Sequence, residues 1–234
     1  GARCVFLNFE PAPGYWSSQA GLALIRQAAE YARQGATWLR LEVQNATLAE
    51  GEIPQVVVQL RNARKQRLGR PLTGAVLVEL LSGAQSLATA QVSCYGDTLA
   101  TNVEFRKALP PGLYLLRATY QEDGQVRETY QTGLWSRDVK LLESGAALRV
   151  RGDYFTKNGA PFLPFGTNYF STDIYGSRFE DGGNAYVWDR DFAEMELHGV
   201  TFVRTGIWGG NADFVDRLTG GAEERFLRAL EAYL

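Results

Sequence analysis

Residues 162–170 read F-L-P-F-G-T-N-Y-F and residues 198–210 read H-G-V-T-F-V-R-T-G-I-W-G-G. Each is an apolar run that ends in polar, aromatic and glycine residues, as do the strands whose C-terminal ends form the binding edge of a barrel or doubly wound sheet. The segment W-D-R-D-F-A-E-M-E-L-H-G between them predicts a helix with Asp189 or Asp191 as N-cap and Gly199 just after its end. Strand, long loop, helix and strand in this order predict a βαβ unit.

A β-hairpin is predicted immediately before the first of these strands. Its sequence is L-R-V-R-G-D-Y-F-T-K-N-G-A-P-F-L-P-F-G, and its turn is expected at Asn158-Gly159. That dipeptide favours the turn because both residues tolerate positive φ angles. In a barrel, such a hairpin would close the bottom.

The C-terminal third of the chain resembles a known family of enzymes. Two features carry the resemblance: the order strand, Asn-Gly turn, strand and F-G-T-N-Y, and the following segment W-x-R-D-F-x-E-M-x-x-H-G-V-x-F-V-R-T-G-I-W. Together they are similar to the start of the (β/α)8 catalytic domain in the clan of retaining glycoside hydrolases. This clan includes β-galactosidases, β-mannanases and family-five cellulases. The resemblance implies a retaining two-carboxylate mechanism on the O-glycosidic bonds of β-linked saccharides. A complete barrel takes about 250 residues, so residues 147–234 are expected to hold only a hairpin and two βα units, as a piece of a larger protein.

Sugar contacts are expected at the ends of the two strands. Asn168 and Tyr169 directly follow the first strand, where barrel enzymes place ligand-binding groups, although a turn or packing role is the alternative. The long loop after them adds Asp173, Tyr175 and Asp181 as candidate contacts or as solvated side chains.

Arg204, Trp208 and His198 surround the second strand. The resemblance implies that Arg204 supports a catalytic nucleophile by keeping its carboxylate ionised; a structural ion pair is the alternative. Trp208 is placed to stack on a sugar ring or to pack under a lid. His198 is expected to end the helix rather than to act in catalysis.

No catalytic residue is expected within this chain. In the hydrolase clan both catalytic glutamates end strands four and seven, which lie outside these 234 residues. The chain alone is therefore expected to bind sugars weakly and to hydrolyse none. A non-catalytic carbohydrate-binding or cell-surface module is the first alternative, and an amidotransferase-like enzyme with its site upstream is the second.

Residues 37–136 are predicted to form an antiparallel, immunoglobulin-like β-sandwich. Apolar side chains recur at every second position in about seven short runs separated by turn signals such as P-P-G and Asp123-Gly124. The apolar positions are Leu39, Leu41, Val43, Val56, Val58, Leu60, Val76, Val78, Leu80, Ala88, Ala90, Val92, Cys94, Leu99, Val103, Phe105, Tyr114, Leu116, Ala118 and Tyr120, with a last strand around 126–130.

Residues 1–36 are predicted to contain one buried strand and one helix. The run R-C-V-F-L-N-F is expected to be the strand, and a helix follows from Ser17 or Ser18 to Gly35. This order resembles the last strand and helix of a class I glutamine-amidotransferase-like domain, through which the protein is a candidate for oligomerisation. With residues 137–146 as a linker, the chain is expected to be a multidomain α+β protein: a sandwich followed by the truncated start of a (β/α)8 TIM barrel.

Composition excludes several classes of partner. The chain has 45% hydrophobic and 21% charged residues and a formal net charge of -2. This balance favours neither nucleic acid nor membrane binding. Cys4 and Cys94 are expected to be unpaired, and one histidine with two cysteines makes a zinc site or another cofactor unexpected. A carbohydrate substrate is the expected partner, and an extracytoplasmic or secreted location is favoured.

Overall fold

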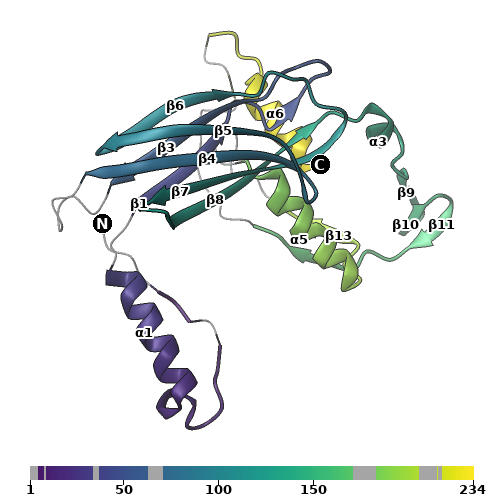
Figure 1. Ribbon diagram of the computed structural model, residues 1–234. Coiled ribbons are helices and arrows are strands. Elements are labelled where there is room, and N and C mark those ends of the chain that lie inside the picture. Colours follow the sequence, from purple (N-terminus) through teal and green to yellow (C-terminus); the bar gives the residue numbers. More distant parts are fainter. Residues whose placement is uncertain are drawn as a thin grey trace.

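The main body of the protein consists of two β-sheets packed face to face, as the computed structural model shows (Figure 1). The structure describes residues 5–7, 9–33, 37–62, 71–170, 183–205, 215 and 218–234. Helices and short strands lie around this β-sandwich.

Among the described residues, eight strands build the sandwich. They are β1 (Thr37–Val43), β2 (Thr47–Leu48), β3 (Gln55–Asn62), β4 (Leu72–Ser82), β5 (Gln85–Gly96), β6 (Thr98–Glu104), β7 (Gly112–Glu122) and β8 (Gln125–Ser136). One sheet has the order β1-β3-β6 and the other has the order β2-β8-β7-β4-β5. Neighbouring strands are antiparallel, except that β2 pairs with β8 in parallel.

The predicted alternation of apolar side chains is confirmed in the strands that form the core. In β1, for example, Leu39, Leu41 and Val43 are buried while the residues between them are more exposed. Successive side chains of a strand point to opposite faces, so every second residue of each sheet enters one shared core. Val58 and Leu116, at 0% exposure, lie in that core on different sheets. Burial stabilises each such side chain by about 1.5–3 kcal/mol.

Strand β8 is longer than the sequence predicts. The alternation indicated a strand around residues 126–130, but β8 continues to Ser136 and residues 132–136 are all buried. Leu134 faces the core between the sheets. Helix α5 (Ala185–Leu197) packs against β7 and β8 and covers part of the opposite face of this sheet. A strand that is covered on both faces has apolar residues on both, so its sequence does not alternate between apolar and polar residues. The alternation therefore did not indicate the last part of β8.

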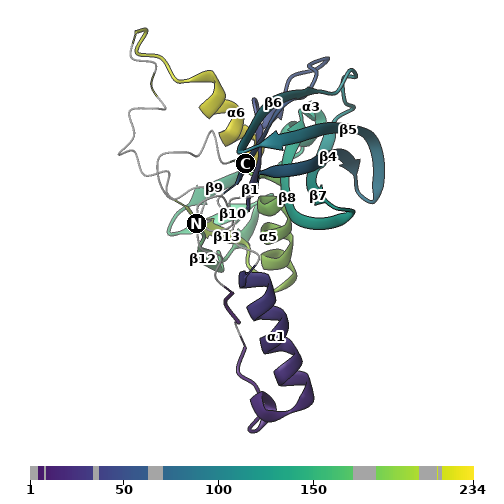
Figure 2. The ribbon, with the colours of Figure 1, turned by 60° about the vertical axis from the view of Figure 1, so that its left-hand side comes forward.

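The N-terminal arm differs from the prediction in its strand and agrees in its helix. Residues 5–7, 9 and 10 form no strand, and Phe6 is 86% exposed. A 3₁₀ turn, η1 (Tyr15–Ser17), leads into α1 (Gln19–Arg33), and the hydroxyl oxygen of Ser18 accepts a hydrogen bond from the backbone N–H of Gly21 at 3.1 Å. Ser18 is therefore one of the two predicted cap residues. Helix α1 projects away from the sheets in both views (Figures 1 and 2). None of the strands that the structure describes lies beside residues 5–7, 9 and 10 to pair with them.

Residues 137–162 form a short helix and the predicted hairpin. The elements are α3 (Val139–Glu143), β9 (Leu148–Arg151), β10 (Tyr154–Lys157) and β11 (Ala160–Phe162), and the three strands pair in the order β11-β10-β9. The turn at Asn158-Gly159 has φ angles of 52° and 80°, as expected for two residues in the left-handed region. Val139, Leu141 and Leu142 of α3 are exposed.

The predicted βαβ unit is present. Strand β12 (Gly166–Asn168) pairs in parallel with β13 (Phe202–Arg204), and α5 lies between them in the chain. The helix N-cap is Asn184, whose side chain accepts a hydrogen bond from Val187 N–H at 3.2 Å, so the expected caps Asp189 and Asp191 are wrong. The C-terminal prediction is confirmed, because His198 is the C-cap and Gly199 has a φ of 79°.

The expected truncated start of a (β/α)8 barrel, and with it the multidomain α+β class, is wrong. Among the described residues the β12–β13 sheet has only two strands, and the protein is mostly β-sheet. Helix α5 packs on β7 and β8 of the sandwich instead of covering further parallel strands. The sequence pattern of residues 162–210 predicts a strand, a helix and a second strand, but it does not indicate which surface the helix packs against.

Candidate functional site

Asn168 and Arg204 lie side by side at the ends of two parallel strands. The register pairs Gly166 with Phe202, Thr167 with Val203 and Asn168 with Arg204. The N–H of Tyr169 donates to the carbonyl of Arg204 at 3.0 Å and extends the ladder by one bond. Opposite residues of a pair point to the same face, so Asn168 and Arg204 share a face with Gly166 and Phe202.

These strand ends line an open groove of about 550 Å³. Its lining residues are Pro164, Gly166, Thr167, Asn168, Phe202 and Arg204. Gly166 is required here because a Cβ atom at this position would lie 2.5 Å from the carbonyl oxygen of Phe202 and 2.9 Å from its ring. The absent side chain lets the Phe202 ring lie directly over the β12 backbone, with half of its surface exposed.

The groove offers an amide, a guanidinium and an exposed aromatic ring. Asn168 and Arg204 are both exposed, and the lining contains no aspartate or glutamate among the residues that the structure describes. Arg204 is therefore exposed, and no carboxylate of the described lining lies beside it. Its proposed support of a nucleophile stays a prediction. The groove can donate and accept hydrogen bonds and provide an apolar surface, but none of its described lining residues can act as a general acid or base.

The side chain of Tyr169, unlike that of Asn168, is not part of the groove lining. Its hydroxyl donates to Oδ2 of Asp191 at 2.8 Å, and its ring lies 5.1 Å from that of Phe192 and 6.4 Å from that of Tyr233. The side chain is half-buried between α5 and α6 (Glu224–Tyr233). Tyr169 therefore anchors the end of β12, which is the packing role weighed against sugar contact in the sequence.

The remaining predicted contacts cannot be placed. Trp208, Asp173, Tyr175 and Asp181 lie outside the described residues. His198 is described, and its Nε2 lies 3.0 Å from Glu194 Oε1 on the exposed surface of α5. This position agrees with a residue that ends the helix.

A second apolar cluster, here called the helical cluster, connects the groove to the sandwich. Its buried members are Ala46, Ala185, Trp188, Ala229 and Tyr233. The rings of Trp188 and Tyr233 meet edge to face, with centroids 5.2 Å apart. Tyr169 packs against this cluster, so the strand end that bears Asn168 is held by side chains from α5, α6 and the loop before β2.

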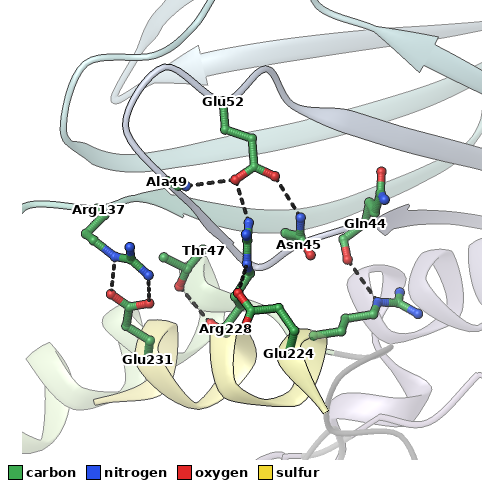
Figure 3. Close-up of polar contacts among 10 residues, drawn as sticks. Gln44, Asn45, Thr47, Ala49, Glu52, Arg137, Glu224, Arg228 and Glu231 are labelled. Carbon is green, nitrogen blue, oxygen red and sulfur yellow. Dashed lines mark hydrogen bonds and ion pairs between the residues drawn. The ribbon is translucent and has the colours of Figure 1, made fainter.

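Polar contacts fasten α6 to the sandwich (Figure 3). Arg228 pairs with Glu52 and Glu224, and Arg137 forms a bidentate pair with Glu231. The hydroxyl of Thr47, itself buried, donates to the carbonyl of Arg228 at 2.7 Å. Helix α6 and the sandwich are therefore joined by charged groups on one side of the helix and by the helical cluster on the other.

Glu52 is the carboxylate with the most contacts in this interface. Burial alone would raise its pKa, but hydrogen bonds from Ala49 N–H, Asn45 and Arg228, together with the positive charge of Arg228, lower the pKa of Glu52 below its ordinary value. The distances are 2.9 Å from the Ala49 nitrogen and 2.8 Å from the Asn45 amide. Glu52 is thus ionised and fixed at neutral pH.

Sequence reasoning did not identify this interface. Glu224 and Arg228 are spaced by four residues, as in a helical ion pair, and that signal was available. The contacts of Arg228 with Glu52 and of Arg137 with Glu231 join residues 176 and 94 positions apart. No local pattern indicates such pairs.

Within the described part of the chain, no three His, Cys, Asp or Glu side chains come together in a group that could hold a metal ion. Among the helices that the structure describes, none has the length and apolar character needed to cross a membrane.

No protein-family model matches this chain, and no curated protein does. Similar solved structures include the CARDB domain of the PF1109 protein from Pyrococcus furiosus, with 11% identity, a TM-score of 0.34 and coverage of 43% of this chain and 92% of that domain. A glycosyl hydrolase family 2 member from Bacteroides cellulosilyticus has 12% identity and a TM-score of 0.36 over 83% of this chain and 24% of its own length. A β-glucosidase from Listeria innocua has 14% identity and a TM-score of 0.29 over 44% of this chain and 16% of its own. Glycoside hydrolases are thus among the structural neighbours, but likeness at this level carries no argument about activity.

Proposed function

We propose that this chain binds carbohydrate through the groove at the ends of β12 and β13, as a non-catalytic, sugar-contacting part of a glycoside hydrolase. The observation that carries the proposal is the juxtaposition of Asn168, Arg204 and the exposed ring of Phe202 in one groove. The resemblance of residues 162–208 to the hydrolase clan supports the same class of ligand.

The chemistry of the groove suits a pyranose. The amide of Asn168 can donate to one hydroxyl and accept from another, and the guanidinium of Arg204 can donate to two neighbouring oxygens. The apolar C–H face of a sugar packs well on an aromatic ring such as Phe202. Because the described lining has no carboxylate pair, binding rather than hydrolysis is the proposed activity of these residues.

Titration of the 234-residue chain with β-linked gluco-, manno- and galacto-oligosaccharides in a calorimeter tests this proposal. We expect weak binding of at least one series, with a dissociation constant on the order of 1 mM because the groove is open. Asn168→Ala and Arg204→Ala should each weaken it by about tenfold, since each removes hydrogen bonds to the ligand.

Arg149→Ala is the matched control, because Arg149 is an exposed strand arginine that does not line the groove. It should leave the dissociation constant unchanged. Absence of binding to all three series at millimolar sugar would overturn the proposal, and so would Asn168→Ala and Arg204→Ala variants that bind as tightly as the unmodified chain. Release of a chromophore from aryl β-glycosides above the buffer blank would contradict its non-catalytic part.

A further inference from the structure

A second hollow lies at one end of the sandwich, away from the β12–β13 groove. It is found between the β4–β5 turn and the loop of residues 105–111 that joins β6 to β7, and its volume is about 450 Å³. Its lining includes Leu80, Leu87, Ala88, Phe105, Arg106, Lys107 and Tyr114. All of them belong to the described range 71–170.

The floor of this hollow is apolar and already formed. Leu80, Phe105 and Tyr114 belong to the main core and are only 1%, 4% and 5% exposed. The hydroxyl of Tyr114 donates to the carbonyl of Pro110 at 2.8 Å, and Ser136 Oγ donates to the carbonyl of Leu109 at 3.0 Å. These two bonds hold the loop against β7 and β8, so the cavity needs little rearrangement to receive a ligand.

The rim carries positive charge without a counter-charge. Arg106 and Lys107 are exposed, and the lining includes no aspartate or glutamate. Neither side chain takes part in an ion pair with any residue that the structure describes. An apolar floor with two adjacent cations at its mouth matches a molecule with an apolar body and an anionic end.

We propose that this hollow binds a small amphipathic carboxylate, with its aliphatic chain on Leu87 and Ala88 and its carboxylate at Arg106 and Lys107. The volume lies in the lower part of the range of about 300–1,000 Å³ found for small-molecule sites. It therefore suits a short chain of about eight carbons. The carboxylate stays at the rim, where it accepts hydrogen bonds from the guanidinium of Arg106 and the ammonium of Lys107 and remains in contact with water, so that its charge is not buried.

Calorimetric titration with three probes tests the proposal. Octanoate has both the chain and the charge, 1-octanol has only the chain, and acetate has only the charge. We expect octanoate to bind about tenfold more tightly than 1-octanol, because only the former makes charge-assisted hydrogen bonds, and acetate to give no measurable binding. The double variant Arg106→Gln/Lys107→Gln should reduce octanoate affinity to that of 1-octanol and leave 1-octanol unchanged.

Two further variants make the outcome specific. Arg149→Gln/Arg151→Gln removes two exposed charges from β9 and should leave octanoate binding unchanged. Ala88→Leu adds volume to the partly buried wall and should weaken octanoate and 1-octanol alike by about tenfold, with a thermal melt to show that the chain remains folded.

Three results would overturn the proposal. The first is no heat of binding for octanoate at millimolar concentration. The second is equal affinity for octanoate and 1-octanol in the unmodified chain. The third is an equal loss of octanoate affinity in the Arg149/Arg151 and Arg106/Lys107 variants, which would indicate a non-specific effect of net charge.

Discussion

Single residues join parts of this chain that are distant in sequence. Arg228 contacts Glu52 in the sandwich and Glu224 in its own helix, while its backbone carbonyl accepts from Thr47. The side chain of Arg228 is 19% exposed and that of Glu52 is 28% exposed, so both partners are largely removed from water. A partly buried pair of this kind has more effect on stability than a fully solvated one, because removal of one member leaves a poorly solvated charge.

Acid should weaken the fold through Glu52. Its pKa in the folded chain lies below the ordinary value of a glutamate, so its contribution to stability is present above the unfolded-state pKa and is lost as the pH falls through the folded-state value. We expect Glu52→Gln to lower the free energy of unfolding by about 1–2 kcal/mol at pH 7, and the difference from the unmodified chain to shrink below about pH 4.5. Urea denaturation from pH 7 to pH 3 measures both effects. The exposed neighbour Glu50, changed to Gln, is the control, and equal pH dependence in the two variants would contradict the prediction.

Cys94 should be unreactive in the folded protein. It is a free thiol with 0% exposure in the main core, and burial, with a smaller effect of the Glu122 charge, raises its pKa. The thiolate is the reactive form, so both access and ionisation are suppressed. In a Cys4→Ser background, an aromatic disulfide reagent at pH 8 should label Cys94 fully in denaturant and negligibly without it. Stoichiometric labelling of the native chain would show that the core at β5 opens readily.

At the scale of elements, α5 depends on one glycine of β8. A Cβ atom at Gly133 would lie 2.4 Å from the backbone nitrogen of Tyr186 and 2.6 Å from its Cβ. The amide of Asn184 also donates to the carbonyl of Gln131 at 3.2 Å, so the first turn of the helix rests directly on the strand. The close approach brings Trp188 into the helical cluster.

Gly133→Ala should therefore displace α5 from the sheet. We expect a loss of about 1–3 kcal/mol in the free energy of unfolding, as is usual for overpacking, and faster amide hydrogen exchange in residues 185–197. Gly145→Ala is the matched control, because nothing lies within 4 Å of the added methyl group. Unchanged exchange in α5 of the Gly133 variant would show that the helix does not rely on this contact.

At the scale of the whole molecule, the C-terminal helix is attached to the sandwich through opposite charges. The Arg137–Glu231 pair is bidentate, and its partners are 36% and 21% exposed. The Arg225–Glu42 pair at 3.1 Å and the Arg228–Glu52 pair complete the set. Together with the helical cluster, they make α6 a bridge between the sandwich and the strands that bear the groove.

Charge exchange should test this attachment. Arg137→Glu and Glu231→Arg should each lower the free energy of unfolding by about 1 kcal/mol, and the double variant should recover much of the loss. Urea denaturation of the four proteins gives the coupling energy, which should fall at about 0.5 M salt because exposed charges are screened. The solvated Glu194–His198 pair, exchanged in the same way, should show no measurable coupling. Additive losses in the Arg137 and Glu231 variants would mean that the pair does not hold α6.

The sequence alone determined the features that depend on neighbouring residues. Side-chain direction and local backbone geometry account for the period-two alternation in β1, β3, β4 and β7, the Asn158-Gly159 turn, the end of α5 at His198 and the parallel pairing of β12 with β13. The juxtaposition of Asn168 and Arg204 follows in turn, because parallel strands end at the same edge.

Only the tertiary structure decided what covers these elements. The sequence predicted the same βαβ unit whether a barrel or a sandwich lay beside it, and packing of α5 on β7 and β8 excluded the barrel. The contacts of Arg228 with Glu52, of Gly133 with Tyr186 and of Tyr169 with Tyr233 likewise join residues far apart in the chain. Such contacts depend on the shape of two surfaces after folding, and local periodicity carries no record of that shape.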